Sequence, residues 1–217
     1  METIDRCRLH TTKAISRKTL CKSADFYYSH GMHIQVVAPQ PAMMQAISAL
    51  YAKTWLATYP NEAYGITRDD IKERTDAMTD PEKVAERLVN IMNVLKDPMQ
   101  FYRVAVDGNE VVGVCAGKVK DECVHLSSLY VLPERQGMGI GTQLLDAFLA
   151  WAKTHKKPIQ LHVVTYNTGA IQFYQTHGFV DTGRRFTEDR FIMKSGNGLP
   201  EMEMRYQVPE STTVSVS

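Results

Sequence analysis

Three glycines alternate where a predicted strand gives way to a predicted helix: Gly137, Gly139 and Gly141. An apolar run over 129–132 precedes them, and apolar residues at helical spacing follow over 140–152. Because glycine has no Cβ, the backbone N–H groups of such a turn can come close to a ligand at the positive end of the helix dipole. The segment therefore predicts a phosphate or pyrophosphate site, although a glycine-rich turn without a ligand has the same spacing.

Two well-known phosphate loops do not fit this segment. A P-loop ends in Gly-Lys-Ser/Thr, whereas the sequence here is Gly139-Ile-Gly-Thr142 and lacks the lysine. A Rossmann loop follows the first strand of a parallel βαβ unit and is followed, about twenty positions later, by an acidic residue. Here the loop follows a predicted antiparallel meander, and the sequence near position 160 is Ile-Gln-Leu-His. Both loops are excluded by their context.

The pattern of apolar residues elsewhere predicts one α+β domain over residues 32–208, without an internal repeat or linker. Helices are expected over about 41–57, from Thr67, from Asp80-Pro81 to about Asp97-Pro98, from the glycine turn to Pro158, and over 170–177. Strands are expected over 33–37, 101–106, 110–119, 124–132, 159–164, from 179 onward and over 203–208. The three strands between 101 and 132 should form an antiparallel meander, because Asp107-Gly108 suits a tight hairpin turn.

The charge balance argues against some classes of function. The chain has 25 Lys and Arg and 24 Asp and Glu; six of the basic and three of the acidic residues lie in 1–31, which leaves 19 and 21 for the rest. This mildly acidic body has no basic stripe that would bind nucleic acid. The sequence also contains no run of roughly 18 apolar residues, which a membrane-spanning helix would need. Four cysteines without paired spacing indicate reduced thiols and a cytoplasmic protein that holds no metal.

The two ends of the chain are expected to lie outside the domain. Residues 1–31 lack the apolar region of a secretory signal and could bury little apolar surface. They are interpreted as a disordered or non-native basic leader ahead of a start at Met32, with a short regulatory arm as the alternative. Residues 209–217 are expected to form a flexible tail.

Two motifs resemble the GNAT N-acetyltransferases. Gln136-Gly-Met-Gly139-Ile-Gly141 matches the Q/R-x-x-G-x-G/A acyl-CoA signature of that superfamily, and Asn167-Thr-Gly-Ala-Ile-Gln-Phe-Tyr-Gln-Thr-His-Gly-Phe179 matches its N-x-x-A-x-x-F-Y-x-x-x-G-F pattern. The resemblance covers nearly all of residues 33–208. Within it, the segments 54–66 and 199–204 look like those of bacterial GNAT proteins grouped around the spermidine/spermine acetyltransferases. It implies a mixed, mostly antiparallel sheet flanked by helices, with a splayed pair of strands that holds acyl-CoA.

The resemblance also implies roles for single residues. Acetyl-CoA is the expected co-substrate, held by backbone or side-chain groups of Leu129, Tyr130, Val131, Gln136, Gly137, Met138, Gly139, Ile140, Gly141, Thr142 and Asn167. Tyr174 is the candidate general acid for the coenzyme A sulfur; the alternative is an aromatic residue that only packs against Phe173. His125 stands where many members have a glutamate as general base; it could instead be structural, with water removing the proton.

The acceptor pocket is expected from the first helices, which carry Trp55, Tyr59, Glu62 and Tyr64. Aromatic walls and a carboxylate suit a cationic amine, although Trp55 could equally be core and Glu62 a solvated loop residue. The expected function is transfer of an acetyl group from acetyl-CoA to a primary amine of a small molecule, polyamine or peptide. The alternative is a non-catalytic acyl-CoA-binding or regulatory module. Neither nucleic acid nor a membrane is an expected partner, and a homodimer is left open.

Overall fold

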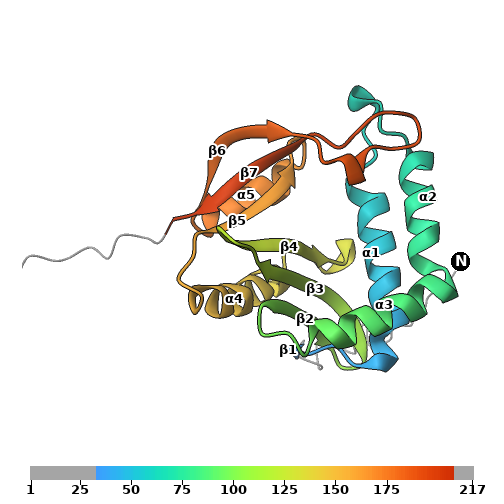
Figure 1. Cartoon of the computed structure of the whole chain (residues 1–217). Helices are drawn as coiled ribbons and strands as arrows, with labels where there is room; N and C mark the ends of the chain where they lie inside the picture. Colours follow the sequence, from blue (N-terminus) through green and yellow to red (C-terminus); the bar gives the residue numbers. More distant parts are fainter. Residues whose placement is uncertain (1–32, 208–217) are drawn as a thin grey trace, which may run out of the picture. The chain divides into compact units, whose positions relative to one another are not determined.

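One sheet of seven strands runs through residues 33–207, the part of the chain that the computed structural model describes (Figure 1). The strands are β1 (Ile34–Val37), β2 (Gln100–Asp107), β3 (Glu110–Val119), β4 (Val124–Val131), β5 (Ile159–Val164), β6 (Phe179–Phe186) and β7 (Glu201–Tyr206), in the order β1-β2-β3-β4-β5-β7-β6. Among these strands only β4 and β5 are parallel, so the expected mixed, mostly antiparallel sheet is confirmed. The predicted leader over 1–31 and tail over 209–217 lie outside the described residues.

Helices α1 (Met44–Thr58) and α4 (Ile140–Lys153) cover opposite faces of this sheet. Neighbouring residues of a strand point to opposite faces. On β2, Tyr102 reaches Tyr51 of α1 with its hydroxyl, whereas Phe101 packs its ring against Phe148 of α4 at 5.7 Å between ring centres. Both helices bury apolar side chains in one core that continues along β2, β3 and β4. The middle strands are thus fixed from both sides.

Two of the remaining helices begin at the residues that the sequence indicates, whereas the last of them begins two residues before the predicted 170–177. Helix α2 (Arg68–Thr79) starts behind Thr67, whose hydroxyl accepts a hydrogen bond from the N–H of Asp70 in a capping box. Helix α3 (Pro81–Val94) starts behind Asp80, whose carboxylate accepts hydrogen bonds from two free amides of the first turn. Helix α5 spans Thr168–Thr176, and short 3₁₀ turns lie at 41–43, 62–64, 133–135 and 189–191. None of the helices within 33–207 has the length and apolar character needed to cross a bilayer.

The predicted end of α4 was wrong by several residues. The helix ends at Lys153 and not at Pro158, because the chain turns through Lys156, which has a φ of 53°. The residue before a proline avoids helical geometry, but this restriction sets only the latest position at which a helix can end.

A bulge in β4 opens the sheet. Leu126 and Ser128 of β4 stand opposite neighbouring residues of β3, so Ser127 is an extra residue in β4. Such a bulge bends the strand and increases its twist. The pairing of β4 with β5 ends at this point, since it covers only 124–126 against 159–161. Beyond the bulge, the backbone edges of β4 and β5 that face each other therefore have no partner among the strands that the structure describes.

Strand β7 lies between β5 and β6 although it comes last in the chain, and it begins two residues before the predicted 203–208. The loop from β6 to β7 reaches across to the connection between α1 and α2 (Figure 1). Asn197 donates a hydrogen bond to the carbonyl of Gly65 at 2.9 Å, and Arg74 of α2 donates one to the carbonyl of Ile192 at 2.7 Å. These bonds tie the β6–β7 loop to the connection between α1 and α2 and to α2 itself.

Candidate active site

A cleft of about 620 Å³ lies between the diverging parts of β4 and β5. Its walls come from β4 over 127–131, β5 over 162–164, the glycine turn, α5, the end of α1, and the segment from the β6–β7 loop into β7. The predicted residues that line it are His125, Leu129, Tyr130, Val131, Gln136, Gly137, Gly139, Gly141, Thr142, Asn167, Tyr174 and Tyr59. The structure thus brings most of the residues predicted for the co-substrate and the chemistry into one cavity.

The glycine turn has the backbone that its sequence predicts. Gly137 and Gly139 have φ values of 77° and 78°, which side chains with a Cβ rarely allow. Apart from the chain neighbours, no heavy atom of residues 33–207 lies within 4 Å of where a Cβ would stand at either position. Gly139 is the N-cap of α4, so the free N–H groups of the first turn lie beside this open space. Gln136 fixes the turn to β4 through a hydrogen bond from its side-chain amide to the carbonyl of Val131. This turn can hold an anion.

Two residues of the turn contribute backbone only. The side chain of Ile140 is buried in the core, and that of Met138 is exposed to solvent, so neither side chain lines the cleft. Arg135 lines the cleft, but its guanidinium is ion-paired with Asp107 and Glu110 and fastens the turn to the β2–β3 hairpin.

Helix α5 places Tyr174 and Asn167 in the cleft. The Asn167 side chain accepts a hydrogen bond from the N–H of Ala170 at 3.2 Å and so caps the helix. Tyr174 is buried and packs against Phe173 and Phe179. Burial raises the pKa of the Tyr174 hydroxyl well above its ordinary value, so this hydroxyl keeps its proton at neutral pH. Packing and a role at the cleft surface are both compatible with this position.

Tyrosine side chains from the end of α1 and from β4 form another part of the wall. Tyr59 at the end of α1 and Tyr130 of β4 are hydrogen-bonded through their hydroxyls at 2.8 Å. Burial raises the pKa of Tyr130 to about 12 and that of Tyr59 well above its ordinary value. Tyr166 donates a hydrogen bond to the carbonyl of Tyr59 at 2.7 Å and holds this wall in place. Both hydroxyls are neutral donors or acceptors at physiological pH.

The other predicted acceptor residues lie outside the cleft. Trp55 is buried in a second apolar cluster, where its ring packs against Tyr59 and Phe191. Glu62 is exposed, and Tyr64 is 46% exposed and packs on Tyr166. In this structure Trp55 therefore supports the wall from behind, and Glu62 and Tyr64 do not contribute to it.

Sequence reasoning missed Glu201. This first residue of β7 is only 5% exposed and lines the cleft. Its carboxylate oxygen Oε2 has no hydrogen-bond partner among the described residues. Burial, and secondly the negative charge of Glu188, raise the pKa of Glu201 to about 7.

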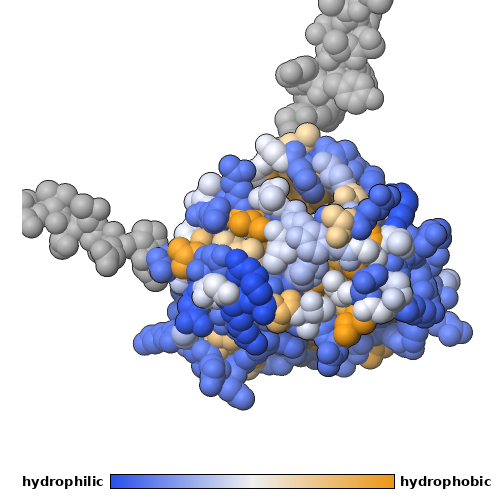
Figure 2. Space-filling view, turned by 90° about the horizontal axis from the view of Figure 1, so that it is seen from above, coloured by the Kyte–Doolittle hydropathy of each residue, from blue (hydrophilic) through white to orange (hydrophobic). Residues whose placement is uncertain are grey.

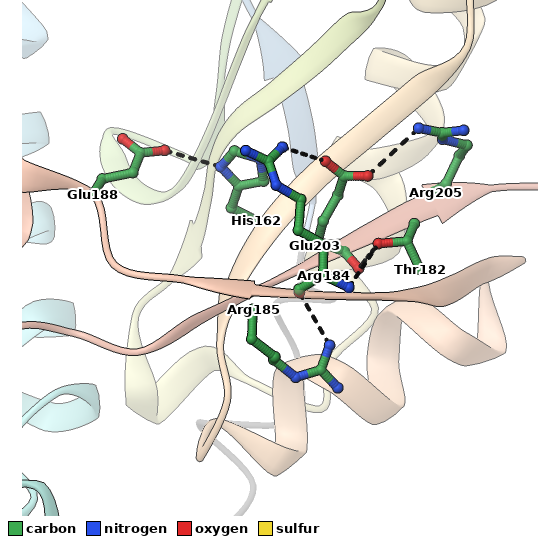
Figure 3. Close-up of polar contacts among 7 residues, drawn as sticks. All are labelled: His162, Thr182, Arg184, Arg185, Glu188, Glu203 and Arg205. Atoms are coloured by element: carbon green, nitrogen blue, oxygen red, sulfur yellow. Dashed lines mark hydrogen bonds and ion pairs between the residues drawn. The ribbon is translucent and has the colours of Figure 1, made fainter.

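Three further titratable side chains, His162, Glu188 and His125, lie near Glu201 in and beside the cleft. His162 of β5 contacts Glu188 through Nδ1 at 2.9 Å (Figure 3), and its ring lies 4.5 Å from the ring of His125. Burial favours a raised pKa at Glu188, but hydrogen bonds from Arg190 and His162 outweigh it and lower that pKa. Burial lowers the pKa of His125 to about 3, helped by the charges of Lys120 and His162. His125 is therefore a neutral imidazole at neutral pH.

Three of these groups could hold a metal ion. The ligand atoms of His162, Glu188 and Glu201 lie within 4.8 Å of one another. Glu188 is already ion-paired with Arg190, whose positive charge disfavours a cation at this point. The expectation that the protein holds no metal stays a prediction.

Comparison with known proteins gives a family and a fold. Residues 46–179 match the sequence model described as the acetyltransferase (GNAT) family. Over 61 residues, the chain is 36% identical to an uncharacterized N-acetyltransferase of Methanocaldococcus jannaschii; this match covers 28% of the chain and about a quarter, 27%, of that relative.

Solved structures resemble the whole described fold. The PaiA N-acetyltransferase of Thermoplasma acidophilum in complex with coenzyme A has a TM-score of 0.63 and 20% identity, over 82% of this chain and 100% of that one. The yncA protein of Salmonella typhimurium with its cofactor acetyl-CoA has a TM-score of 0.59 and 19% identity, over 85% and 99%. The ribosomal-protein-S5-alanine acetyltransferase of Vibrio fischeri has a TM-score of 0.63 and 17% identity, over 83% and 96%. At these identities the likeness shows the fold.

Proposed function

Because this chain belongs to the acetyltransferase (GNAT) family, we propose that it transfers the acetyl group of acetyl-CoA to a primary amine of a small molecule, polyamine or peptide. One observation carries the proposal: the anion-binding glycine turn and the buried hydroxyl of Tyr174 line the same cleft between β4 and β5. Two solved structures of the same fold contain coenzyme A or acetyl-CoA, which supports acetyl-CoA as the co-substrate here.

The cleft fits the parts of acetyl-CoA. The glycine turn together with the start of α4, from Gly137 to Thr142, offers free N–H groups for the pyrophosphate. The unpaired backbone edge of β4 over 127–131 offers N–H and C=O groups for the amides of the pantetheine arm. We assign the co-substrate to these backbone groups, with Gln136 and Asn167 fixing the turn and the start of α5.

Acetyl transfer needs a proton at the departing sulfur. In the proposed reaction, the amine nitrogen attacks the thioester carbonyl carbon, a C–N bond forms, and the C–S bond breaks to leave a thiolate. Tyr174 is assigned as the group that holds a proton against this sulfur, since its raised pKa keeps the hydroxyl protonated. The proton that the attacking nitrogen loses restores the hydroxyl. His125, the candidate base from the sequence, lines the same cleft.

The acceptor would reach the thioester along the wall formed by Tyr59, Tyr130 and Glu201. Aromatic rings and one carboxylate suit a cationic amine. We infer a cytoplasmic location, because Cys115 and Cys123 are buried free thiols. The face that Figure 2 shows is mainly hydrophilic, with apolar residues in small separate patches, and we assign neither a membrane nor nucleic acid to it. A homodimer stays a prediction, and the molecular mass from sedimentation would test it.

The test combines binding with a screen of acceptors. Calorimetry with acetyl-CoA should show binding, and the screen should follow coenzyme A release with butylamine, 1,4-diaminobutane, phenethylamine and an alanyl peptide as acceptors. Absence of acetyl-CoA binding at millimolar ligand would contradict the proposal at its first step. Binding without turnover on any amine would instead favour a non-catalytic acyl-CoA-binding or regulatory module.

A further inference from the structure

We propose that Glu201 is the catalytic base of this site, and that its carboxylate takes the proton which the acceptor ammonium must lose before it attacks the thioester. The proposal rests on the proposed acetyl transfer and adds a residue from the last strand to it. Neither the glycine turn nor the α5 motif contains this residue.

The position of Glu201 follows from the strand order. Because β7 is inserted beside β5, Glu201 stands opposite Val164, the last residue of β5. Both residues line the cleft that Tyr174 lines from α5. The next residue on the same face of β7 is Glu203, which is equally buried but does not line the cleft. Only the first of the two carboxylates is therefore placed to meet a ligand.

One carboxylate oxygen of Glu201 is free. Oε2 is buried and has no hydrogen-bond partner among residues 33–207. Buried polar atoms without a partner are rare, and each calls for an explanation. An ammonium group in the cleft would give Oε2 the donor that the protein does not supply. Glu203 differs, because Arg184 and Arg205 donate to its two oxygens (Figure 3).

The charges around Glu201 suit a proton acceptor at neutral pH. Glu188 and Arg190 face it from the β6–β7 loop, His162 from β5, Tyr59 from α1 and Tyr130 from β4. Burial and the charge of Glu188 raise the pKa of Glu201 to about 7, while the charge of Arg190 and the backbone of Glu188 act against this rise. A general base is most effective when its pKa lies near the working pH.

The other candidates are less suited to this role. His125 has a pKa of about 3, so its neutral ring binds a proton far more weakly than Glu201 does. Glu188 is ion-paired with Arg190 and hydrogen-bonded to His162. Glu62 is exposed outside the cleft. Glu201 is suited to act as the base, because it lines the cleft, has an oxygen without a hydrogen-bond partner among the described residues, and has a pKa near the working pH.

Glu201 and Tyr174 together account for every proton that moves in the proposed acetyl transfer. The carboxylate of Glu201 takes one proton from R–NH₃⁺, which gives R–NH₂ and a protonated Glu201. The amine lone pair forms the C–N bond, the C–S bond breaks, and the Tyr174 hydroxyl gives its proton to the sulfur. The second proton on nitrogen restores Tyr174, and Glu201 releases its proton to solvent. The products are the acetylated amine, coenzyme A and one proton.

The experiment compares Glu201→Gln with Glu203→Gln, a matched change two residues along the same buried face. With an amine from the screen above, wild-type kcat/KM should rise through an apparent pKa near 7 and then level off. Glu201→Gln should lose about 10²- to 10⁴-fold at pH 7. This deficit should shrink about tenfold for each pH unit above 7, because alkyl amines with a pKa of about 10 supply more neutral nucleophile. Acetyl-CoA affinity should stay unchanged, and Glu203→Gln should follow the wild-type profile.

Two outcomes would overturn the inference while leaving acetyl transfer intact. One is a Glu201→Gln deficit of equal size at every pH, which a binding or structural role would give. The other is a ¹³C NMR titration in which the glutamate carboxyl resonance that Glu201→Gln removes titrates near the ordinary pKa of 4.5 and not near pH 7. A wild-type protein that binds acetyl-CoA but acetylates no amine would contradict the proposed function itself.

Discussion

Glu201→Gln should stabilise the folded protein at alkaline pH, whatever it does to activity. The pKa of Glu201 is about 7 in the folded protein against an ordinary value of 4.5. Between these two values the folded state binds a proton that the unfolded chain has lost, so stability falls as pH rises through this window. Glutamine cannot ionise, and the variant therefore escapes this loss.

The magnitude follows from the two pKa values. They differ by about 2.5, and one pKa unit corresponds to about 1.4 kcal/mol, which gives an upper value of about 3.5 kcal/mol. Water that enters the cleft screens the charge, so we expect about 2 kcal/mol at pH 8 and close to zero at pH 4.5. This is a large share of the roughly 5–15 kcal/mol that stabilises a typical domain.

Urea unfolding at pH 5 and pH 8 measures this difference. The fluorescence of Trp55 and Trp151, the chain's two tryptophans, reports the transition. Glu203→Gln is the control and should change stability in the opposite direction at pH 8, because it weakens the pairs with Arg184 and Arg205. A Glu201→Gln variant that is less stable than the wild type at pH 8, or shifted equally at both pH values, would refute the reasoning.

Three further variants test the rest of the site and the core. Tyr174→Phe should lower kcat by about 10²-fold or more with acetyl-CoA affinity kept, since it removes only the proton donor; unchanged kcat would exclude the assigned role. Gly139→Ala should abolish acetyl-CoA binding in calorimetry, whereas Gly183→Ala, which strains an equally left-handed backbone outside the cleft, should keep it. Phe148→Ala should cost about 3–5 kcal/mol in urea unfolding, because the ring is fully buried; a loss under about 1 kcal/mol would contradict this packing.

Local features of the fold could be predicted because local chemistry determines them. Thr67 and Asp80 begin helices because their side chains accept hydrogen bonds from the free amides of the next turn, which needs no distant partner. Gly137 and Gly139 can adopt positive φ values because glycine has no Cβ, which is again a local property of the residue. The end of α4 was misjudged because Pro158 limits a helix without fixing its last residue.

The cleft itself could be expected only through resemblance. Nothing in the alternating pattern of 124–132 marks Ser127 as the extra residue of a bulge, since bulges depend on the pairing with a neighbouring strand. The pKa of His125 was equally out of reach. An isolated histidine titrates near pH 6.5, and only burial beside Lys120 and His162 turns it into a group that stays neutral.

Glu201 shows most clearly why sequence reasoning stops short of the site. Residues 201–204 alternate Glu and Met, which places Glu201 and Glu203 on one face of a strand, and the local pattern predicts nothing further about them. Their different environments come from strand order: insertion of β7 beside β5 places one carboxylate in the cleft and the other between two arginines. Burial of the Glu201 carboxylate lowers the stability of the folded protein, and the neighbouring residues do not compensate for this. A residue kept in such a position is a candidate for function. If Glu201→Gln gains stability and loses catalysis at pH 8, the same buried charge explains both results.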